Sequence, residues 1–273
     1  MYDIVLPGRG KRMVEPARGE WAPLVEDLAA ALSEALKDGA PYAFVGFAFG
    51  AVLAYETALA MTDSAPCLLA AISAEAPSWK GWAAPKPGAL LIGDNKGGVV
   101  ARTETHKLSD EDFEAALRRR GGPRAISLLD EPELKSMFLP TLRANAQLEE
   151  TYTFLSGAER MGNIVTAEKM RTAKKIPVLA FYGAQPGRDD ERTRTMKADV
   201  EPWLEMPRLM KTKNSKVADW PVMAIQEHDW YMLEPSSDRD DATTGAKEVL
   251  EHVKTFFNKV VLPKLPKKQG VQV

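Results

Sequence analysis

The stretch from residue 43 to residue 51 constrains the fold more than any other part of the sequence. A short apolar run enters a turn in which Gly46 and Gly50 flank Ala48, and an Ala- and Leu-rich run follows at once. We expect a strand, a tight turn and a buried helix in direct succession. Only hydrogens at the two glycines would let strand and helix pack so closely. A strand that passes directly into a helix is typical of α/β folds with parallel strands.

The same alternation continues on both sides of this turn. Short apolar runs predict strands over Tyr2–Leu6, Pro41–Val45, Pro66–Ser73, Ile176–Tyr182 and Val222–Ile225. Helical spacing predicts helices over Trp21–Leu36, Phe49–Met61, Asp112–Arg120 with Ser109 as its cap, Asp130–Leu142 and Arg143–Leu155 with a break at Pro140, and Ala246–Phe257. Together these elements predict a mostly parallel sheet flanked by helices.

The middle of the chain departs from the alternation. Gly81–Gly98 is rich in Gly and Pro and is expected to be a loop, and helical patterns without strands follow it. We interpret residues 80–160 as a helical lid inserted between strands, with ordinary crossover helices as the alternative. Neither a repeat nor a long linker divides the chain. We therefore predict a single domain over residues 1–262 and a loose tail over residues 263–273.

Composition excludes several classes of partner. The 273 residues carry a formal net charge of −2, which argues against nucleic acid and anionic membranes as partners. No apolar run is long enough to span a bilayer, and the first residues lack a secretion signal, so we expect a location in the cytoplasm or an organellar stroma. Three histidines and one cysteine show no zinc-like spacing, and we expect no metal. His106 is expected at the surface.

Five segments, in order, resemble type II thioesterases, which release acyl groups from carrier proteins of polyketide and peptide assembly lines. The segments are Leu6–Arg12 (LPGRGKR) followed by Glu15-Pro16, Gly46–Ala51 (GFAFGA) followed by Ala54-Tyr55-Glu56, Leu139–Ala144 (LPTLRA) with Glu149–Tyr152, Pro177–Gly183 (PVLAFYG), and Glu227–Leu233 (EHDWYML). They span roughly residues 2–257. The resemblance implies an α/β-hydrolase fold that acts on acyl thioesters of an acyl carrier protein or of coenzyme A. It implies no cofactor beyond the carrier's phosphopantetheine.

The resemblance also assigns the site residues. Ala48 stands where the family's G-x-S-x-G elbow carries the nucleophilic serine, and His228 matches the catalytic histidine. Gly46, Gly50 and the Phe49 amide would form the elbow and its oxyanion donor. A methyl group cannot attack a thioester, so we expect the chain as written to be inactive. Either Ala48 replaces a serine in a real thioesterase, which the intact His228 segment favours, or the chain is a natural pseudoenzyme. Such a pseudoenzyme would bind an acyl group or a carrier-protein partner without cleaving it, and the departures from the family's acid motif and N-terminal loop favour it.

The triad's acid is harder to place. The family strand ends in a glycine followed closely by aspartate, whereas here the first carboxylates after Gly183 are Asp189 and Asp190. Either one would orient the histidine if the loop is long, and solvated loop carboxylates are the alternative. Glu75, after the third predicted strand, is a remote candidate. A lyase or cyclase that uses His228 as a general base without a nucleophile is a further alternative.

Two more features follow from the resemblance. The family begins with an extra strand and an F-P-x-A-G-G-like loop that supplies an oxyanion donor, and this chain opens at the next strand. We expect one donor fewer, worth about 3 kcal/mol in comparable sites. Phe47 replaces the family's usual histidine beside the nucleophile and, with Phe138 and Tyr152 of the predicted lid, is a candidate for contact with the acyl chain. For the lid aromatics, burial for packing alone is equally consistent.

Overall fold

The computed structural model describes residues 2–61, 66–72, 74–78, 104–120, 123–154, 178–184, 202–203, 224–229, 251 and 253–264. The chain divides into two compact units. Unit 1 contains residues 1–27 and 80–153, and unit 2 contains residues 28–79 and 154–273. Helix α1 (Trp21–Ala35) begins in the first unit and ends in the second. Each unit is described below by itself.

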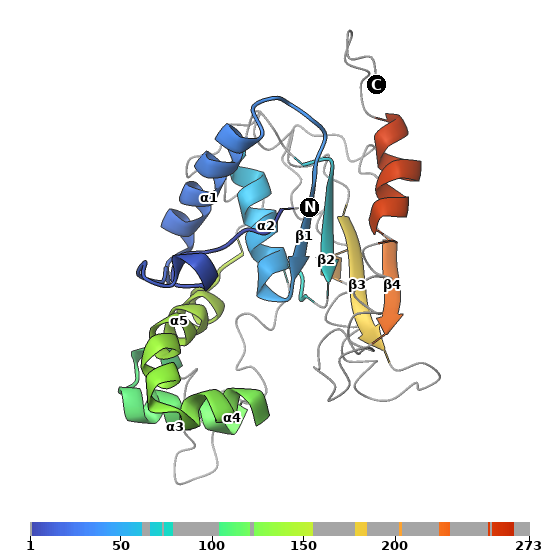
Figure 1. The fold of residues 1–273 in the computed structure, drawn as a ribbon. Helices are drawn as coiled ribbons and strands as arrows, with labels where there is room; N and C mark the ends of the chain where they lie inside the picture. Colours follow the sequence, from blue (N-terminus) through green and yellow to red (C-terminus); the bar gives the residue numbers. More distant parts are fainter. Residues whose placement is uncertain are drawn as a thin grey trace. The chain divides into compact units, whose positions relative to one another are not determined.

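Unit 2 is built on a parallel sheet. Its described strands are β1 (Ala43–Phe47), β2 (Leu68–Ile72), β3 (Val178–Ala184) and β4 (Ala224–Asp229), hydrogen-bonded in that order and all parallel (Figure 1). Every residue of β2 is buried, as expected for a strand covered on both faces, whereas β1 alternates between buried and exposed residues. The predicted α/β class with a mostly parallel sheet is confirmed.

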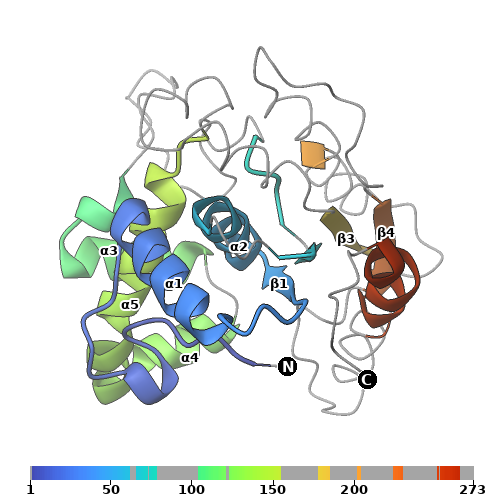
Figure 2. The ribbon, with the colours of Figure 1, turned by 90° about the horizontal axis from the view of Figure 1, so that it is seen from above.

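Helical segments lie on both faces of this sheet (Figure 2). Helix α2 (Phe49–Ala60) packs with β1 and β2 around one cluster of buried side chains that includes Tyr55, Leu69 and Trp203. The other cluster joins Leu68 and Phe181 to the C-terminal helical segment, in which residues 251 and 253–256 lead into η6 (Phe257–Val261) and η7 (Leu262–Lys264). The predicted closing helix therefore extends beyond Phe257.

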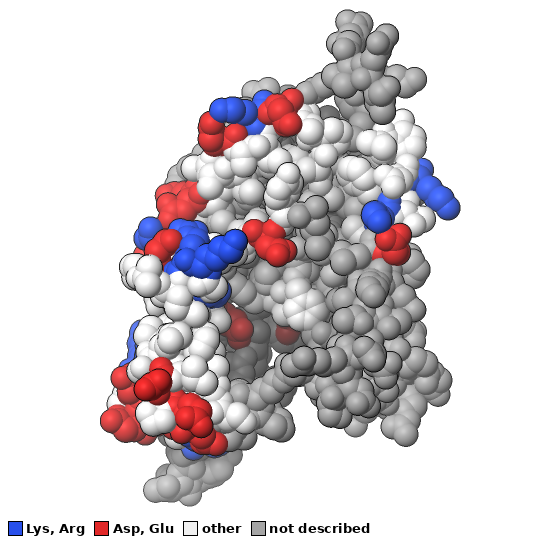
Figure 3. Space-filling view, viewed as in Figure 1, with Lys and Arg blue, Asp and Glu red and all other residues white. Residues whose placement is uncertain are grey.

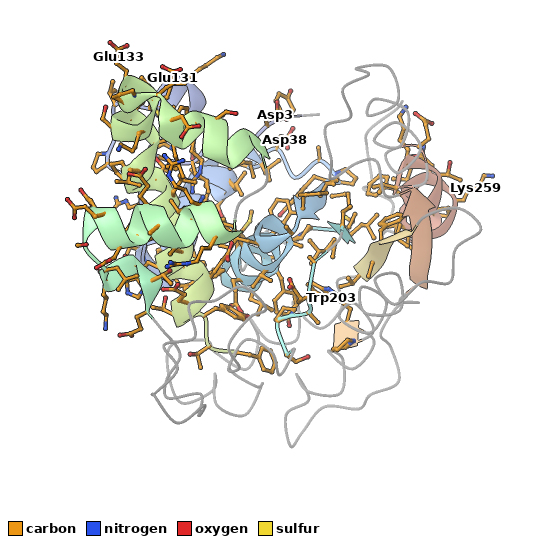
Figure 4. The ribbon with its side chains drawn as sticks, turned by 90° about the horizontal axis from the view of Figure 1, so that it is seen from below. Asp3, Asp38, Glu131, Glu133, Trp203 and Lys259 are labelled. Carbon is orange, nitrogen blue, oxygen red and sulfur yellow. The ribbon has the colours of Figure 1, made fainter. Side chains whose placement is uncertain are left out.

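Unit 1 is helical among its described residues. It contains η1 (Gly10–Arg12), the first turns of α1, η3 (Thr105–Lys107), α3 (Asp110–Arg120), α4 (Pro123–Asp130) and α5 (Pro132–Thr151). Helix α3 starts as predicted, because the Ser109 hydroxyl accepts the Asp112 backbone N–H at 3.1 Å. Glu131 and Glu133, at the start of α5, point away from the surrounding side chains (Figure 4). The assignment of this region as a lid stays a prediction.

Two predicted elements are wrong. Tyr2–Leu6 forms no strand: Tyr2 is 98% exposed, and the Val5 carbonyl accepts a hydrogen bond from the Arg12 guanidinium instead of a neighbouring strand. The predicted break at Pro140 does not occur, because α5 runs through it. Proline removes one helical hydrogen bond, but Thr141 directly after it is buried and bonded to Gly8, and such tertiary contacts outweigh a single missing bond.

The described helices include none that is both long and apolar enough to cross a bilayer. On the face drawn in Figure 3, the basic and acidic side chains of the described residues lie next to one another in several places. The ion pairs of the described residues include Arg12 with Glu15 at 2.6 Å and Arg18 with Asp27 at 3.0 Å. Exposed pairs of this kind contribute little stability each.

Candidate active site

The turn between β1 and α2 consists of a single residue. Strand β1 ends at Phe47, α2 begins at Phe49, and Ala48 between them has φ 47° and ψ −129°. It is the one non-glycine residue with positive φ in the described part of the chain. Such a conformation costs a residue with a Cβ about 1–3 kcal/mol and is concentrated at functional sites. α/β-Hydrolases carry their nucleophile on a strained strand-to-helix turn of this kind, and that role for position 48 stays a prediction.

The two glycines of this turn differ in what they do. A Cβ on Gly46 would lie 2.3 Å from the Ala51 Cα, 2.6 Å from its nitrogen and 2.6 Å from the Gly50 carbonyl oxygen. Because all three are backbone atoms, α2 could not stay where it is. A Cβ on Gly50 would meet no atom within 4 Å among the described residues, apart from its chain neighbours and the backbone of its own helix. The steric reason expected for both glycines therefore holds at Gly46 and is wrong at Gly50.

Backbone hydrogen bonds fix the turn on the sheet. The Ala48 N–H donates to the Ile72 carbonyl at the end of β2 (2.9 Å), and the Ala51 N–H donates to the Ala48 carbonyl (2.9 Å). The N-terminus of α2 thus starts directly after Ala48, where the positive end of a helix dipole favours developing negative charge. The oxyanion role of the Phe49 amide stays a prediction.

Phe47, beside the turn, is 41% exposed, and Val45 two residues earlier is 44% exposed. Since alternate residues of a strand face the same side, both side chains lie on the face of β1 opposite Gly46 and α2. An aromatic ring with this exposure is available to an apolar ligand. The contact of Phe47 with substrate stays a prediction.

The backbone of His228 is placed by the sheet register. It lies in β4, paired with Gly183 of β3, rather than beyond the end of the strand as the predicted Val222–Ile225 would have it. The paired residues Phe47, Ile72, Phe181 and Gln226 mark one level across the four strands. His228 is two residues past that level and Ala48 one, so both are at the carboxyl edge. Three strand spacings separate them, roughly 14 Å.

Neither predicted acid can be assessed from the fold, because Asp189 and Asp190 lie outside the described residues. Glu75 is described and half-buried, in the segment Ala74–Ser78 that follows β2. This segment is held by a residue that sequence reasoning missed. Trp203, labelled in Figure 4, donates its indole N–H to the Ala74 carbonyl at 2.9 Å. Its ring is fully buried and lies edge-on to that of Tyr55 of α2, with 5.8 Å between the ring centroids. An isolated tryptophan between Pro202 and a leucine gave no signal of this role.

The predicted lid aromatics lie in unit 1. Phe138 is half-buried on α5, while Tyr152 is only 4% exposed and its ring lies 4.7 Å from that of Trp21. The expectation that His106 is a surface residue is wrong: its side chain is 9% exposed and its Nδ1 lies 2.6 Å from the Glu150 carboxylate. The described residues contain no group of three metal-ligating side chains.

Comparison with known proteins gives the family context. The Thioesterase domain family model matches residues 1–256. The chain is similar to RedJ, a thioesterase from the prodiginine biosynthetic pathway in Streptomyces coelicolor, with 23% identity, a TM-score of 0.54, and coverage of 92% of this chain and 77% of that one.

Two further solved structures have similar folds. One is the serine-to-alanine mutant of YbtT, a type II thioesterase from the yersiniabactin NRPS/PKS pathway (21% identity, TM-score 0.51, 93% and 82% coverage of this chain and that one). The other is ClbQ from the colibactin NRPS/PKS pathway (17%, 0.52, 91% and 84%). No curated protein matches the chain in sequence. At these identities the structural likenesses show a shared fold.

Proposed function

Because the chain belongs to the thioesterase family, we propose that it is a type II thioesterase in which Ala48 occupies the place of the nucleophilic serine. The conformation of Ala48 is the observation that carries this proposal. A backbone at φ 47° is costly for alanine, and nothing in alanine's chemistry repays that cost. The strain has a purpose where the side chain must stand out from the turn as a nucleophile. We infer that alanine has replaced serine in a site whose backbone is otherwise retained.

The chemistry requires an oxygen at position 48. In the proposed reaction a serine oxygen at this position attacks the thioester carbonyl, its proton passes to the histidine, and the protonated thiol leaves. Water then attacks the acyl-enzyme, the carboxylic acid departs, and the serine regains its proton. The alanine methyl group has no lone pair and no acidic proton. Loss of the nucleophile in such a triad costs about a million-fold in rate, so the chain as written binds its substrate without turnover.

His228 is the base in this proposal, and Asp189 or Asp190 orients it, with Glu75 as the alternative acid. The sheet register sets a condition, because a roughly 14 Å separation between strand positions exceeds what a histidine and a serine side chain span. The proposal therefore requires that β4 end before His228 when substrate is bound. The imidazole would then be carried back toward the turn on a loop.

The proposed substrates are acyl groups joined as thioesters to the phosphopantetheine arm of an acyl carrier protein, or to coenzyme A. The family supports this class, and the solved thioesterases that share the fold come from biosynthetic pathways that include NRPS/PKS pathways. We further propose that residues 80–160 form a lid, that residues 1–262 work as one hydrolase domain, and that Phe47, Phe138 and Tyr152 contact the acyl chain.

Hydrolysis of acetyl- and hexanoyl-coenzyme A by four purified proteins tests the proposal. The chain as written should show no turnover above background, and Ala48→Ser should gain activity of at least a hundredfold over it. Ala54→Ser, which puts a serine elsewhere on α2, is the matched control and should stay inactive. Adding His228→Ala to Ala48→Ser should abolish the gain.

An Ala48→Ser variant that folds, binds acyl-coenzyme A and still does not hydrolyse it would overturn the hydrolase proposal. The chain would then be a natural pseudoenzyme that binds acyl groups. Turnover by the unaltered chain that depends on His228 would overturn it in another way, in favour of a general-base lyase or cyclase.

A further inference from the structure

One face of α5 is held by the segment Pro7–Trp21, which is called the N-terminal clamp below. Four of the residues that contact it, Thr141, Asn145, Leu148 and Tyr152, recur at intervals of four, three and four, which places these four on one side of a helix. Three of the contacts are hydrogen bonds: Thr141 Oγ1 to the Gly8 carbonyl (2.9 Å), the Arg9 guanidinium to the Asn145 side-chain oxygen, and the Trp21 indole N–H to the Leu148 carbonyl (2.7 Å). The fourth is the ring contact of Trp21 with Tyr152.

These contacts are buried or partly buried. Thr141 is 7% exposed and Leu148 is fully buried. The turn at Gly8 is shaped to receive α5: its φ is +78°, and a Cβ there would lie 2.9 Å from the Ala17 side chain and 3.0 Å from the Thr141 hydroxyl. Only glycine fits this turn without strain. Thr141 therefore reaches the clamp's backbone at a residue that has no side chain to intervene.

The Arg9 contact differs from an ordinary surface ion pair. The guanidinium is partly buried, and among the described residues it donates to two neutral acceptors, the Pro7 carbonyl (3.1 Å) and the Asn145 side-chain oxygen. Burial lowers the pKa of Arg9, because desolvation disfavours its charged form. A cation that has lost water needs every acceptor that it has, so separation from Asn145 is costly.

The opposite side of α5 is held as well. Arg143 donates to the carbonyls of His106 (2.8 Å) and Leu108 (2.7 Å) and pairs with Asp110 at 2.6 Å. Seven residues on, Glu150 contacts the His106 ring at 2.6 Å and accepts from its backbone N–H at 3.2 Å. Helix α5 thus lies between the N-terminal clamp and the η3–α3 segment, with polar anchors on both sides.

We propose that the N-terminal clamp and α5 open and close as one cooperative body, so that α5 is never a flap that swings free of residues 7–21. If α5 moved away from the clamp alone, it would break the three hydrogen bonds described above and expose Leu148 and Tyr152. If α5 and the clamp moved together, the contacts between them would stay intact. The contacts that support this coupling all lie within unit 1. Its consequence, that access to substrate requires the clamp to move with the lid, rests on the proposed lid function.

Hydrogen exchange followed by mass spectrometry tests this coupling. Thr141→Val removes the hydroxyl that bonds Gly8 and keeps the side chain's shape. Thr151→Val on the same helix is the matched control, since among the described residues the Thr151 hydroxyl donates to the Gln147 carbonyl within α5 (2.6 Å) and to no acceptor in the clamp. We expect Thr141→Val to speed exchange about tenfold in peptides of both 8–15 and 132–151, by equal factors, with residues 43–60 unchanged. The control should leave residues 8–15 unchanged.

Faster exchange in α5 with residues 8–15 unchanged would overturn the proposal, because it would show that the helix opens alone. Equal effects of Thr141→Val and its control would also overturn it. If Thr141→Val fails to fold, Trp21→Phe, which keeps a smaller aromatic ring and removes the indole N–H that donates to the Leu148 carbonyl, is read in the same way. Hydrogen exchange is measured without turnover, so a negative result in this experiment does not contradict the hydrolase proposal. An inactive Ala48→Ser variant, in turn, does not contradict the coupling of α5 to the clamp.

Discussion

The two glycines of the turn around Ala48 should respond in opposite ways to the same substitution. Gly46→Ala puts a methyl carbon 2.3 Å from one backbone atom and 2.6 Å from two others, all in α2. Normal contact needs about 3.5 Å or more, so α2 would have to move by about 1 Å away from β1. Overpacking typically costs 1–3 kcal/mol, and more where a backbone must shift. We expect a loss of about 3 kcal/mol or more.

Gly50→Ala places its methyl group in open space, in the first turn of α2. Alanine loses less backbone entropy on folding than glycine and is favoured in a helix by about 0.5–1 kcal/mol. The predicted effect is therefore a small stabilisation. The two variants should differ by about 4 kcal/mol although they lie four residues apart and change the same group.

Urea unfolding followed by far-UV circular dichroism measures both variants under the same conditions. Comparison of the midpoints is meaningful if the slopes with denaturant concentration agree. If Gly46→Ala is as stable as the original chain, or if Gly50→Ala loses as much as Gly46→Ala, the steric account of the turn is refuted. Crystallographic displacement of α2 in Gly46→Ala would locate the strain directly.

Three further outcomes are expected. Ala48→Gly should leave the free energy of unfolding in urea unchanged or raise it by up to about 2 kcal/mol, because glycine adopts φ 47° without strain. Replacing alanine by glycine usually destabilises a protein, so a loss above about 1 kcal/mol would contradict the strained turn. Hydrogen bonds from Lys135 and, second, from Arg118 lower the pKa of Glu114 from 4.5. The ionised Glu114 therefore stabilises the folded state fully above pH 4.5, and this stabilisation is lost as the pH falls through the lowered pKa. Glu114→Gln should therefore destabilise at pH 7 and converge with the original chain once the pH has fallen below the lowered pKa of Glu114; a difference that stays constant with pH would refute this. Asn145→Asp gives the Arg9 guanidinium a charged acceptor and should raise the free energy of unfolding by up to about 1 kcal/mol at low salt, and by less at high salt. Destabilisation at low salt would contradict this role of the Arg9 contact.

The central part of the fold follows from the sequence for physical reasons. A run of apolar residues broken by Gly46 and followed by small and apolar residues leaves few options but strand, turn and helix, and β1, Ala48 and α2 form in that order. The turn's position at Ala48 was predicted from the spacing of two glycines. The steric need at Gly46 was predicted too, but the freedom at Gly50 depends on what packs nearby, which spacing does not reveal.

Other parts were decided by contacts that local patterns do not encode. The apolar run Tyr2–Leu6 resembles a strand, yet a strand forms only where a neighbour accepts its hydrogen bonds, and the Val5 carbonyl bonds Arg12 instead. Pro140 ends a helix in isolation, but the buried contacts of Thr141 keep α5 continuous. His106 looked like a surface residue because its partner, Glu150, is 44 positions away.

Only the part of the candidate site that is local in sequence could be predicted from a sequence pattern. Ala48, Gly46 and Gly50 are close in sequence, so one motif found them together. His228 was found only through a resemblance over the whole chain, and its backbone position in β4 differs from the expected loop. Trp203, which holds the segment after β2 through the Ala74 carbonyl, carries no local pattern and was missed.

Covalent labelling with a fluorophosphonate tests most directly whether the turn at position 48 is a nucleophile's position. An activated serine oxygen attacks phosphorus, fluoride leaves, and the adduct is located by mass spectrometry of tryptic peptides, whatever acyl group the natural substrate carries. We predict an adduct at residue 48 in folded Ala48→Ser, none there in the unaltered chain, and strongly reduced labelling when His228→Ala is added. A folded Ala48→Ser protein that takes up no label at residue 48, or no more than the same protein in urea, would contradict the account.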